Sequence, residues 1–277
     1  MGRLNMTKKY LIAGLKMTVF LSVCCLVLGK NDDKVLRLVS DLLLGKNVPK
    51  EFLTKTFSDS SVTIHPEIPQ KFKSPYEEKP YQQYRKIFIT ENRIKKGVRF
   101  YKENIRLIEA VADSYNVDPV FLLSISGIES NFGRSHGEFL VFNAFYTIIH
   151  EMPKKANWAA KELAEYLEYC YADKIDPHSL YGSYAGAFGF GQFIPSSFNY
   201  YAVDFDGNNI RQPYHWPDVL ASIANYLRKN GYEESHGPIK KGSRSWNSIY
   251  AYNHSENYVK VVIELGEEYR KRINRRE

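Results

Sequence analysis

The sequence contains few cysteines, and their positions exclude one common way of stabilising an exported domain. Three occur in 277 residues, and Cys24 and Cys25 are adjacent inside an apolar N-terminal segment. If that segment is removed on export, Cys170 remains alone, so no disulfide can form within the mature chain. Cys170 follows a helical pattern with Leu163 and Leu167. This pattern predicts a buried thiol that packs in the core.

A general excess of positive charge is also missing. The formal net charge is +7, but residues 1–30 hold five Lys or Arg and no acidic residue. The rest of the chain has 33 basic residues against 31 acidic ones, and its remaining basic bias lies in residues 270–276. A charge distribution of this kind gives no electrostatic footprint for nucleic acid.

No apolar run has the length of an ordinary membrane-spanning helix. Met17–Leu28 has twelve residues and follows a charged region, as in an export signal. We therefore expect residues 1–29 to be an export signal, with an uncleaved anchor as the alternative. Residues 21–24 partly resemble a lipoprotein signal, in which Cys24 or Cys25 would carry the lipid and anchor the protein in a membrane. Each interpretation directs the chain to the cell envelope, in the periplasm.

Alternation of apolar and polar residues is scarce and no internal repeat is present, so the sequence predicts a mostly α fold with little β. Residues 30–80 contain a short amphipathic stretch at 32–44 and four prolines between 57 and 80. We expect this part to be an irregular segment that packs on the main domain, residues 81–277. Helices are predicted at 81–116 in two pieces, 117–134, 139–151, 161–171, after Pro195, at 218–230 and after the capping residue Ser255.

One predicted helix, in VDPVFLLSISGIESNFGR at residues 117–134, ends on a carboxylate. Asp118 can cap it and Pro119 suits its first turn. Apolar residues cover more than one face, so the helix should be mostly buried. Glu129 comes where these residues give way to polar ones. Desolvation raises the pKa of a carboxyl group, as a general acid near neutral pH requires. The alternative is an ordinary glutamate on the exposed side of a helix end.

Residues 182–193, GSYAGAFGFGQF, form a glycine-rich loop. Its four glycines allow close backbone approach. The loop lacks the Lys-Ser/Thr ending of a phosphate-binding loop, and the sequence predicts no strand before it. Both absences argue against nucleotide binding.

Four motifs together are similar to one enzyme family. GIESNFG, GSYAGAFGFGQFIPSSF, ASIANYL and AYNHSENY, in this order, resemble the membrane-bound lytic murein transglycosylase B family, over roughly Tyr81–Arg270. The resemblance implies a lysozyme-like, α-rich catalytic domain at 81–277. It also implies cleavage of the MurNAc-GlcNAc β-1,4 bond in peptidoglycan glycan strands. In this family the cleavage uses no water and leaves a 1,6-anhydromuramoyl end.

A single carboxylate suits that reaction. Ordinary glycosidases flank the bond with two carboxylates about 5–10 Å apart, whereas here only Glu129 stands in a matching motif. It would protonate the leaving oxygen and then take the proton of the sugar's 6-hydroxyl as that group attacks C1. No cofactor is required for this chemistry. Two alternatives stay open, a hydrolytic muramidase and a protein that binds peptidoglycan without cleaving it.

The same resemblance implies substrate contacts, position by position. Ser183 and Gln192 would bond acetamido and hydroxyl groups near the cleaved bond, or only stabilise the loop. Tyr252 and Asn253 would lie beside Glu129, and Asn253 would orient the acetamido group. The remaining predicted substrate contacts are Tyr84, Tyr226, Tyr258, Lys154, Lys155 and Trp158. Each of these tyrosines is a groove residue or a core aromatic. The lysine pair replaces an arginine pair that faces the stem peptide and loses its planar fork, and the tryptophan stands where a tyrosine is usual.

Residues 204–218 resemble a calcium loop, with oxygen atoms at alternating positions. The predicted ligands are Asp204, Asp206, Asn208, Ile210 and Asp218. Asn209 replaces the glycine of the sharp turn, and asparagine tolerates the left-handed conformation better than most residues. The alternative is a polar turn that binds no metal. In the proposed chemistry a calcium ion would be structural.

Overall fold

The computed structural model describes residues 34–73, 79–234 and 237–274. Helices dominate these residues, and a single two-stranded sheet accompanies them. The predicted mostly α fold is therefore confirmed. The predicted export signal at 1–29, including Cys24 and Cys25, lies outside the described residues. Within the parts of the chain that are described, no helix combines the length and apolarity needed to cross a bilayer.

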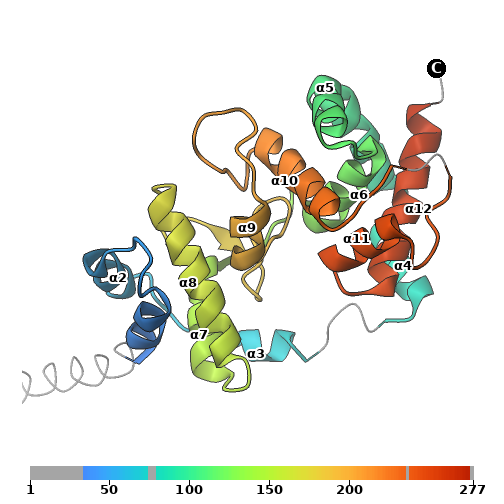
Figure 1. Cartoon of the computed structure of the whole chain (residues 1–277). Helices are drawn as coiled ribbons and strands as arrows, with labels where there is room; N and C mark the ends of the chain where they lie inside the picture. Colours follow the sequence, from blue (N-terminus) through green and yellow to red (C-terminus); the bar gives the residue numbers. More distant parts are fainter. Residues whose placement is uncertain (1–33, 74–78, 235–236, 275–277) are drawn as a thin grey trace, which may run out of the picture.

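Residues 34–42 are helical and precede the elements labelled in Figure 1. Those elements are α2 (Lys50–Phe57), α3 (Ile68–Lys71), α4 (Tyr81–Phe88), α5 (Glu91–Tyr115), α6 (Pro119–Ser130), β1 (Phe139–Leu140), α7 (Val141–Glu151), α8 (Ala156–Ala172), β2 (Tyr181–Gly182), α9 (Pro195–Tyr201), α10 (Trp216–Lys229), α11 (Arg244–Tyr252) and α12 (Glu256–Ile273).

The apolar helix α6 packs against α5, α10 and α12. Figure 1 shows α5, α6 and α12 grouped on one side of the molecule. The Asp118 side chain accepts the Val120 amide at 3.1 Å, and Pro119 occupies the first helical position. Asn131 ends the helix in the left-handed conformation, with φ of 49°. The local capping signals thus set both ends of the helix that carries Glu129.

The other side of the molecule is built on the α7–α8 pair, with α2 beyond it (Figure 1). Phe57 of α2 packs edge-on against Phe142 of α7, with ring centroids 5.0 Å apart. Val39, Leu53 and Ile68 are buried in the same hydrophobic core as α7 and α8. The N-terminal segment is therefore tied to the core by apolar side chains.

We had expected residues 30–80 to be irregular, but part of this segment is helical. It forms α2 and the short α3. Leu53 and Phe57, four residues apart, lie on one face of α2 and are buried. The prolines at 66 and 69 do not prevent α3. Pro69 lies in its first turn, where the backbone amide has no partner within the helix, so its absence costs no hydrogen bond.

Two further predictions need correction at the sheet. The helix expected at 139–151 begins only at Val141, because Phe139 and Leu140 form β1. A strand also precedes the glycine-rich loop, since Tyr181–Gly182 is β2 and pairs antiparallel with β1. Gly137 (φ 108°) makes this possible, because a Cβ there would come within 1.9 Å of the Gly182 backbone. The residues alone did not reveal this long-range contact.

The remaining helix predictions differ mainly in their bounds. The two pieces at 81–116 are α4 and α5, and the helix at 218–230 is α10. The predicted 161–171 helix is longer, since α8 begins at Ala156, and α11 was not predicted. Ser255 caps α12 as expected, its hydroxyl accepting the Tyr258 amide at 3.3 Å. Cys170 is a buried free thiol, as predicted.

Candidate active site

Glu129 lies in the last turn of α6 and is half-buried. The Tyr258 hydroxyl donates to its Oε1 at 2.5 Å. Ser255 starts α12 so that Tyr258 falls in the first turn, with its ring fully buried. Burial raises the pKa of Tyr258 well above its ordinary value, and the nearby Glu129 charge raises it further. Tyr258 therefore stays a proton donor to the carboxylate.

A layer of tyrosines supports this pair. The rings of Tyr252 and Tyr258 are nearly parallel, with centroids 6.4 Å apart. The Tyr252 hydroxyl donates to the Gly191 carbonyl at 2.6 Å and so joins α11 to the glycine-rich loop. Burial, with Glu129 as the next cause, raises the pKa of Tyr252 well above its usual range. Tyr226 packs against Tyr252 with centroids 4.7 Å apart. Glu129, α11 and the glycine-rich loop are thus connected through the contacts of Tyr258 and Tyr252.

The glycine-rich loop holds Ser183 and Gln192 through its own backbone. The Ser183 hydroxyl accepts the Ala187 amide at 3.1 Å. The Gln192 Nε2 donates to the carbonyls of His136 and Gly189, at 3.1 and 2.8 Å. Both side chains therefore stabilise the loop. The hydroxyl proton of Ser183 and the Oε1 of Gln192 are not used in these bonds and can serve a ligand.

Gly186 shapes the middle of the same loop. Its φ of 81° is the left-handed conformation, and a Cβ there would lie 2.1 Å from the Phe145 ring. The loop backbone consequently rests directly on α7. Asn253 is the half-buried C-cap residue of α11, next to Tyr252. These placements bring the Glu129, Ser183, Gln192, Tyr252 and Asn253 segments to one region.

Three of the predicted groove tyrosines are buried, which fits the core-aromatic alternative, and their contact with a substrate stays a prediction. Tyr84 and Tyr258 are each only 1% exposed, and Tyr226 is 8% exposed. The Tyr226 hydroxyl donates to the Ala251 carbonyl at 2.6 Å. All three rings belong to the buried part of the molecule, and Tyr258 contacts Glu129 directly. Residue type and motif position could not separate a groove tyrosine from one buried beneath it.

Lys154 and Lys155 lie exposed before α8, and Trp158 is half-buried in its first turn. The Lys155 ammonium lies 5.1 Å from the Phe72 ring centroid and 5.8 Å from that of Trp158. Trp158 also packs edge-on against Phe145. Lys155 is therefore held over aromatic rings, which is a different placement from an open charge pair.

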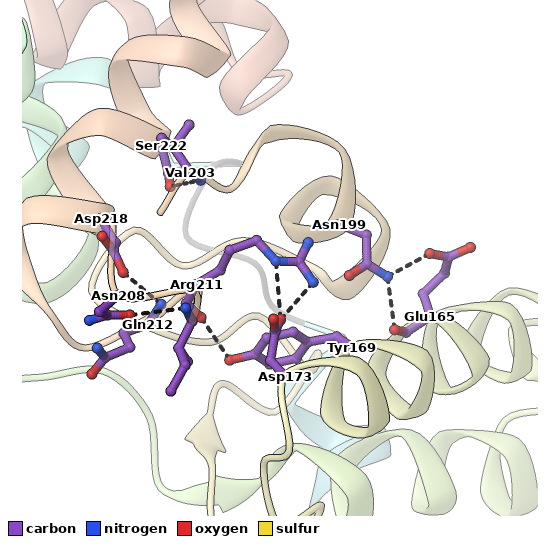
Figure 2. A network of polar contacts seen from close by, with 11 residues as sticks. Glu165, Tyr169, Asp173, Asn199, Val203, Asn208, Arg211, Gln212, Asp218 and Ser222 are labelled. Carbon is purple, nitrogen blue, oxygen red and sulfur yellow. Dashed lines mark hydrogen bonds and ion pairs between the residues drawn. The ribbon is translucent and has the colours of Figure 1, made fainter. Parts of the chain in front are cut away.

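The predicted calcium loop is held by many backbone contacts. Asp204 accepts the amides of residues 207, 208 and 209, the shortest at 2.7 Å to Asn209. Asp218 accepts the amides of Phe205 and Gln212, both at 2.9 Å. Figure 2 shows Arg211, from the end of the loop, paired with Asp173 after α8, at 2.6 Å. The loop is thereby fastened to α8 and α10.

Two of the three predicted carboxylate ligands come together. Asp206 and Asp218 bring carboxylate oxygens to a cluster with a ring nitrogen of His215, and the three atoms lie within 4.8 Å of one another. Asp204 is outside this cluster, and the Asn208 Oδ1 accepts the Ile210 amide at 2.9 Å. Two carboxylates fit calcium, whereas a histidine nitrogen does not.

His215 was missed by the sequence analysis. His215 stands three residues before Asp218, but a calcium loop is expected to have oxygen ligands, so a histidine was not among the predicted ligands. The same analysis also missed Lys71 and Arg134, which share a pocket with Ser183. Their meeting depends on where α3 packs, which no local pattern reports.

The helical fold is lysozyme-like, and its site combines one half-buried carboxylate, buried tyrosines and a glycine-rich loop. The chain belongs to the transglycosylase SLT domain family, whose model matches residues 31–242. Membrane-bound lytic murein transglycosylase B of Escherichia coli is 35% identical over 149 residues, which are 54% of this chain and 41% of that relative. The match thus spans less than half of the relative's length.

Solved structures share the fold. The soluble lytic transglycosylase SltB1 from Pseudomonas aeruginosa has a TM-score of 0.79 at 27% identity, over 86% of this chain and 99% of that one. The Escherichia coli lytic transglycosylase Slt35 in complex with calcium has a TM-score of 0.77 at 22% identity, over 86% and 93% of the two chains.

Proposed function

We propose that this protein is a peptidoglycan lytic transglycosylase that cleaves the MurNAc-GlcNAc β-1,4 bond. The observation that carries the proposal is the bond between the Tyr258 hydroxyl and Glu129, in a chain of the transglycosylase family. The Tyr258 hydroxyl fixes the orientation of this half-buried carboxylate, as a group that protonates a glycosidic oxygen requires. Residues 81–277 would form the catalytic domain, with residues 30–80 packed on it.

In the proposed reaction Glu129 is the single acid and base. Protonated Glu129 gives its proton to the glycosidic oxygen as the bond from C1 to that oxygen breaks. The 2-acetamido group of the substrate stabilises the positive charge at C1. The 6-hydroxyl oxygen then bonds to C1 and returns its proton to Glu129. Atoms balance without water, and the product is a 1,6-anhydromuramoyl end.

The other predicted site residues would position the sugar. The Ser183 hydroxyl proton and the Gln192 Oε1 are available to hydroxyl and acetamido groups, and the half-buried Asn253 amide would orient the acetamido group. Tyr258 would hold Glu129 in place and is a positioning residue. Because these groups already have a fixed backbone frame, substrate binding needs little rearrangement of the loop.

The decisive test is Glu129→Gln in the purified protein on isolated sacculi. We expect release of anhydro-muropeptides by the unchanged protein and a loss of at least about a hundredfold in the variant, since general acid–base groups contribute about 10²–10⁴-fold. Mass spectrometry of the products is the measurement. Glu103→Gln, at an exposed position on α5, is the matched control and should keep full activity.

Product mass distinguishes the reaction types. Products heavier by one water, with a reducing end, would make the protein a hydrolytic muramidase instead. Binding of sacculi by both the unchanged protein and the variant, with no cleavage by either, would make it a binding protein.

We further propose that Asp206 and Asp218 bind a structural calcium ion. The ion would neutralise two carboxylates that otherwise repel each other, and it would take no part in the chemistry. We expect millimolar calcium to raise the melting temperature by a few degrees and chelation to reverse this, with no rise in the Asp206→Asn variant. An equal response of that variant, or a response to zinc through His215 instead of calcium, would contradict the proposal.

For location, we propose the periplasmic side of the cell envelope. Support comes from the charged and apolar pattern of residues 1–29 and from family membership. Attachment through a lipid on Cys24 or Cys25 would be detected as an added mass on the N-terminal peptide, and Cys24→Ser with Cys25→Ser would remove it.

A further inference from the structure

A second recess adjoins the segments that carry the active site. It has a volume of about 520 Å³ and is lined by residues 71, 134–139, 183 and 184. Arg134 lies five residues after Glu129, and the Ser135 amide donates to the Ser130 carbonyl at 2.9 Å. Ser183 lies at the start of the glycine-rich loop. We call this recess the Arg134 pocket.

Two cations line the Arg134 pocket. Lys71 and Arg134 are both exposed, and within the described residues neither forms an ion pair. The Lys71 ammonium lies 5.6 Å from the centroid of the Phe139 ring. Glu138 is the one carboxylate among the lining residues. The pocket therefore presents two positive charges against one negative charge.

Lys71 is held in place by the residue that follows it. Phe72 packs edge-on against Tyr184 of the glycine-rich loop, with ring centroids 5.0 Å apart. The Lys155 ammonium also lies over the Phe72 ring, 5.1 Å from its centroid. Because α3 ends on these contacts, the Lys71 backbone is fixed beside the loop.

We propose that the Arg134 pocket binds a carboxylate of the peptide that peptidoglycan carries beside the cleaved bond. The inference rests on the proposed function. Glycan sugars supply no free anion there, because the lactyl carboxyl is bonded to the peptide, whereas the peptide carries free carboxylates. Arg134 provides a planar fork for one of them, and Lys71 adds a point charge.

This assignment differs from the one expected for the lysine pair before α8. Lys155 is held over the rings of Phe72 and Trp158, and it lacks the guanidinium fork. Lys155 supports α3, and through α3 it supports Lys71. Peptide recognition therefore shifts from the start of α8 to the segment that directly follows the Glu129 helix.

The test measures binding in the Glu129→Gln background, which keeps the glycan intact. Two ligands are compared by calorimetry: short glycan strands with their peptides, and the same strands after an amidase has removed the peptides. We expect Arg134→Gln to weaken binding of the peptide-bearing strands about tenfold, and Lys71→Gln to weaken it severalfold. Binding of stripped strands should stay within about twofold for both variants.

Two controls sharpen the comparison. Glu138→Gln removes the opposing charge and should tighten binding of peptide-bearing strands. Arg99→Gln, an exposed cation on α5 outside the pocket, should change neither ligand. Equal weakening for both ligands, or no weakening for either, overturns the proposal. Failure of the proposed function is seen separately, as the absence of cleavage by the protein with Glu129 intact.

Discussion

The proton of the Tyr258 hydroxyl is committed to Glu129, at an oxygen separation of 2.5 Å. Tyr258 is only 1% exposed, which limits the access of water to this bond. A carboxylate that accepts such a bond has a defined orientation. At the scale of residues, Tyr258 is therefore the group on which the geometry of Glu129 depends most directly.

We predict that Tyr258→Phe lowers kcat by about 10–100-fold, because a hydrogen bond to a charged group contributes about 1.5–3 kcal/mol. KM should stay within about twofold, because the proposed role of the buried Tyr258 is to position Glu129. Steady-state kinetics on purified glycan strands measures both constants. Tyr250→Phe is the matched control, a half-buried tyrosine stacked on Trp246, and should leave kcat unchanged. An equal rise in KM would show that the variant disturbs binding instead.

Local sequence was a good guide to some residues. The Asp118 and Ser255 caps and the buried Cys170 were predicted, because each depends on neighbours within one or two helical turns. The burial of Tyr84 and Tyr226 was left open by the sequence, because it depends on which elements cover their rings. A family motif identifies which residue is a candidate, but it does not say whether the side chain is buried or exposed.

Helix α9 begins where the glycine-rich loop ends, and one buried carboxylate on α8 holds that junction. Glu162 is 6% exposed and accepts both the amide and the hydroxyl of Ser196, each at 2.9 Å. Burial raises the pKa of Glu162, and the two bonds from Ser196 oppose the rise without cancelling it. At the scale of elements, this contact fixes α9 and the exit of the loop against α8.

A raised folded-state pKa means that the folded protein holds the Glu162 proton more tightly than the unfolded chain. The resulting stability is present below the unfolded pKa and is lost as pH rises through the folded pKa. We predict that Glu162→Gln becomes more stable relative to the unchanged protein as pH rises from about 4 to 7. Urea unfolding at several pH values measures this. A difference that falls with pH would contradict it.

Comparison of Glu162→Ala with Glu162→Gln distinguishes the hydrogen bonds from the charge, because glutamine keeps an acceptor oxygen and alanine does not. It should lower the free energy of unfolding by about 1–3 kcal/mol, because the Ser196 donors lose their acceptor. Glu165→Ala, one turn along α8, is the comparison. Its partner Asn199 also bonds the Glu165 carbonyl, so that variant should cost less.

At the scale of the whole molecule, α2 and α8 share the core that contains Cys170. The thiol is 0% exposed, and burial raises its pKa well above the ordinary value. It also lines a pocket with Phe52 of α2 and Tyr171 of α8, whose rings meet edge-on at 5.3 Å. Cys170 therefore reports whether the N-terminal segment stays docked.

We predict that, with Cys24 and Cys25 replaced by serine, the folded protein reacts with a thiol reagent at least about a thousandfold more slowly than the urea-unfolded chain. Absorbance of the released reagent measures the rate. Fast labelling of folded protein would show local opening of α2 without global unfolding. Phe52→Ala should accelerate labelling if α2 is what shields the thiol.

The sequence alone determined the mostly α class, the two capped helices that carry Glu129 and Tyr258, the motif order and the candidate carboxylate. These follow from composition and from side chains that interact over a few positions along the chain. The tertiary structure decided which distant residues meet. It joined Tyr258 to Glu129 across 129 positions, paired β1 with β2, brought His215 to Asp206 and placed Lys71 beside Arg134. Such contacts depend on how helices pack around a shared core, and no pattern within one helix specifies them.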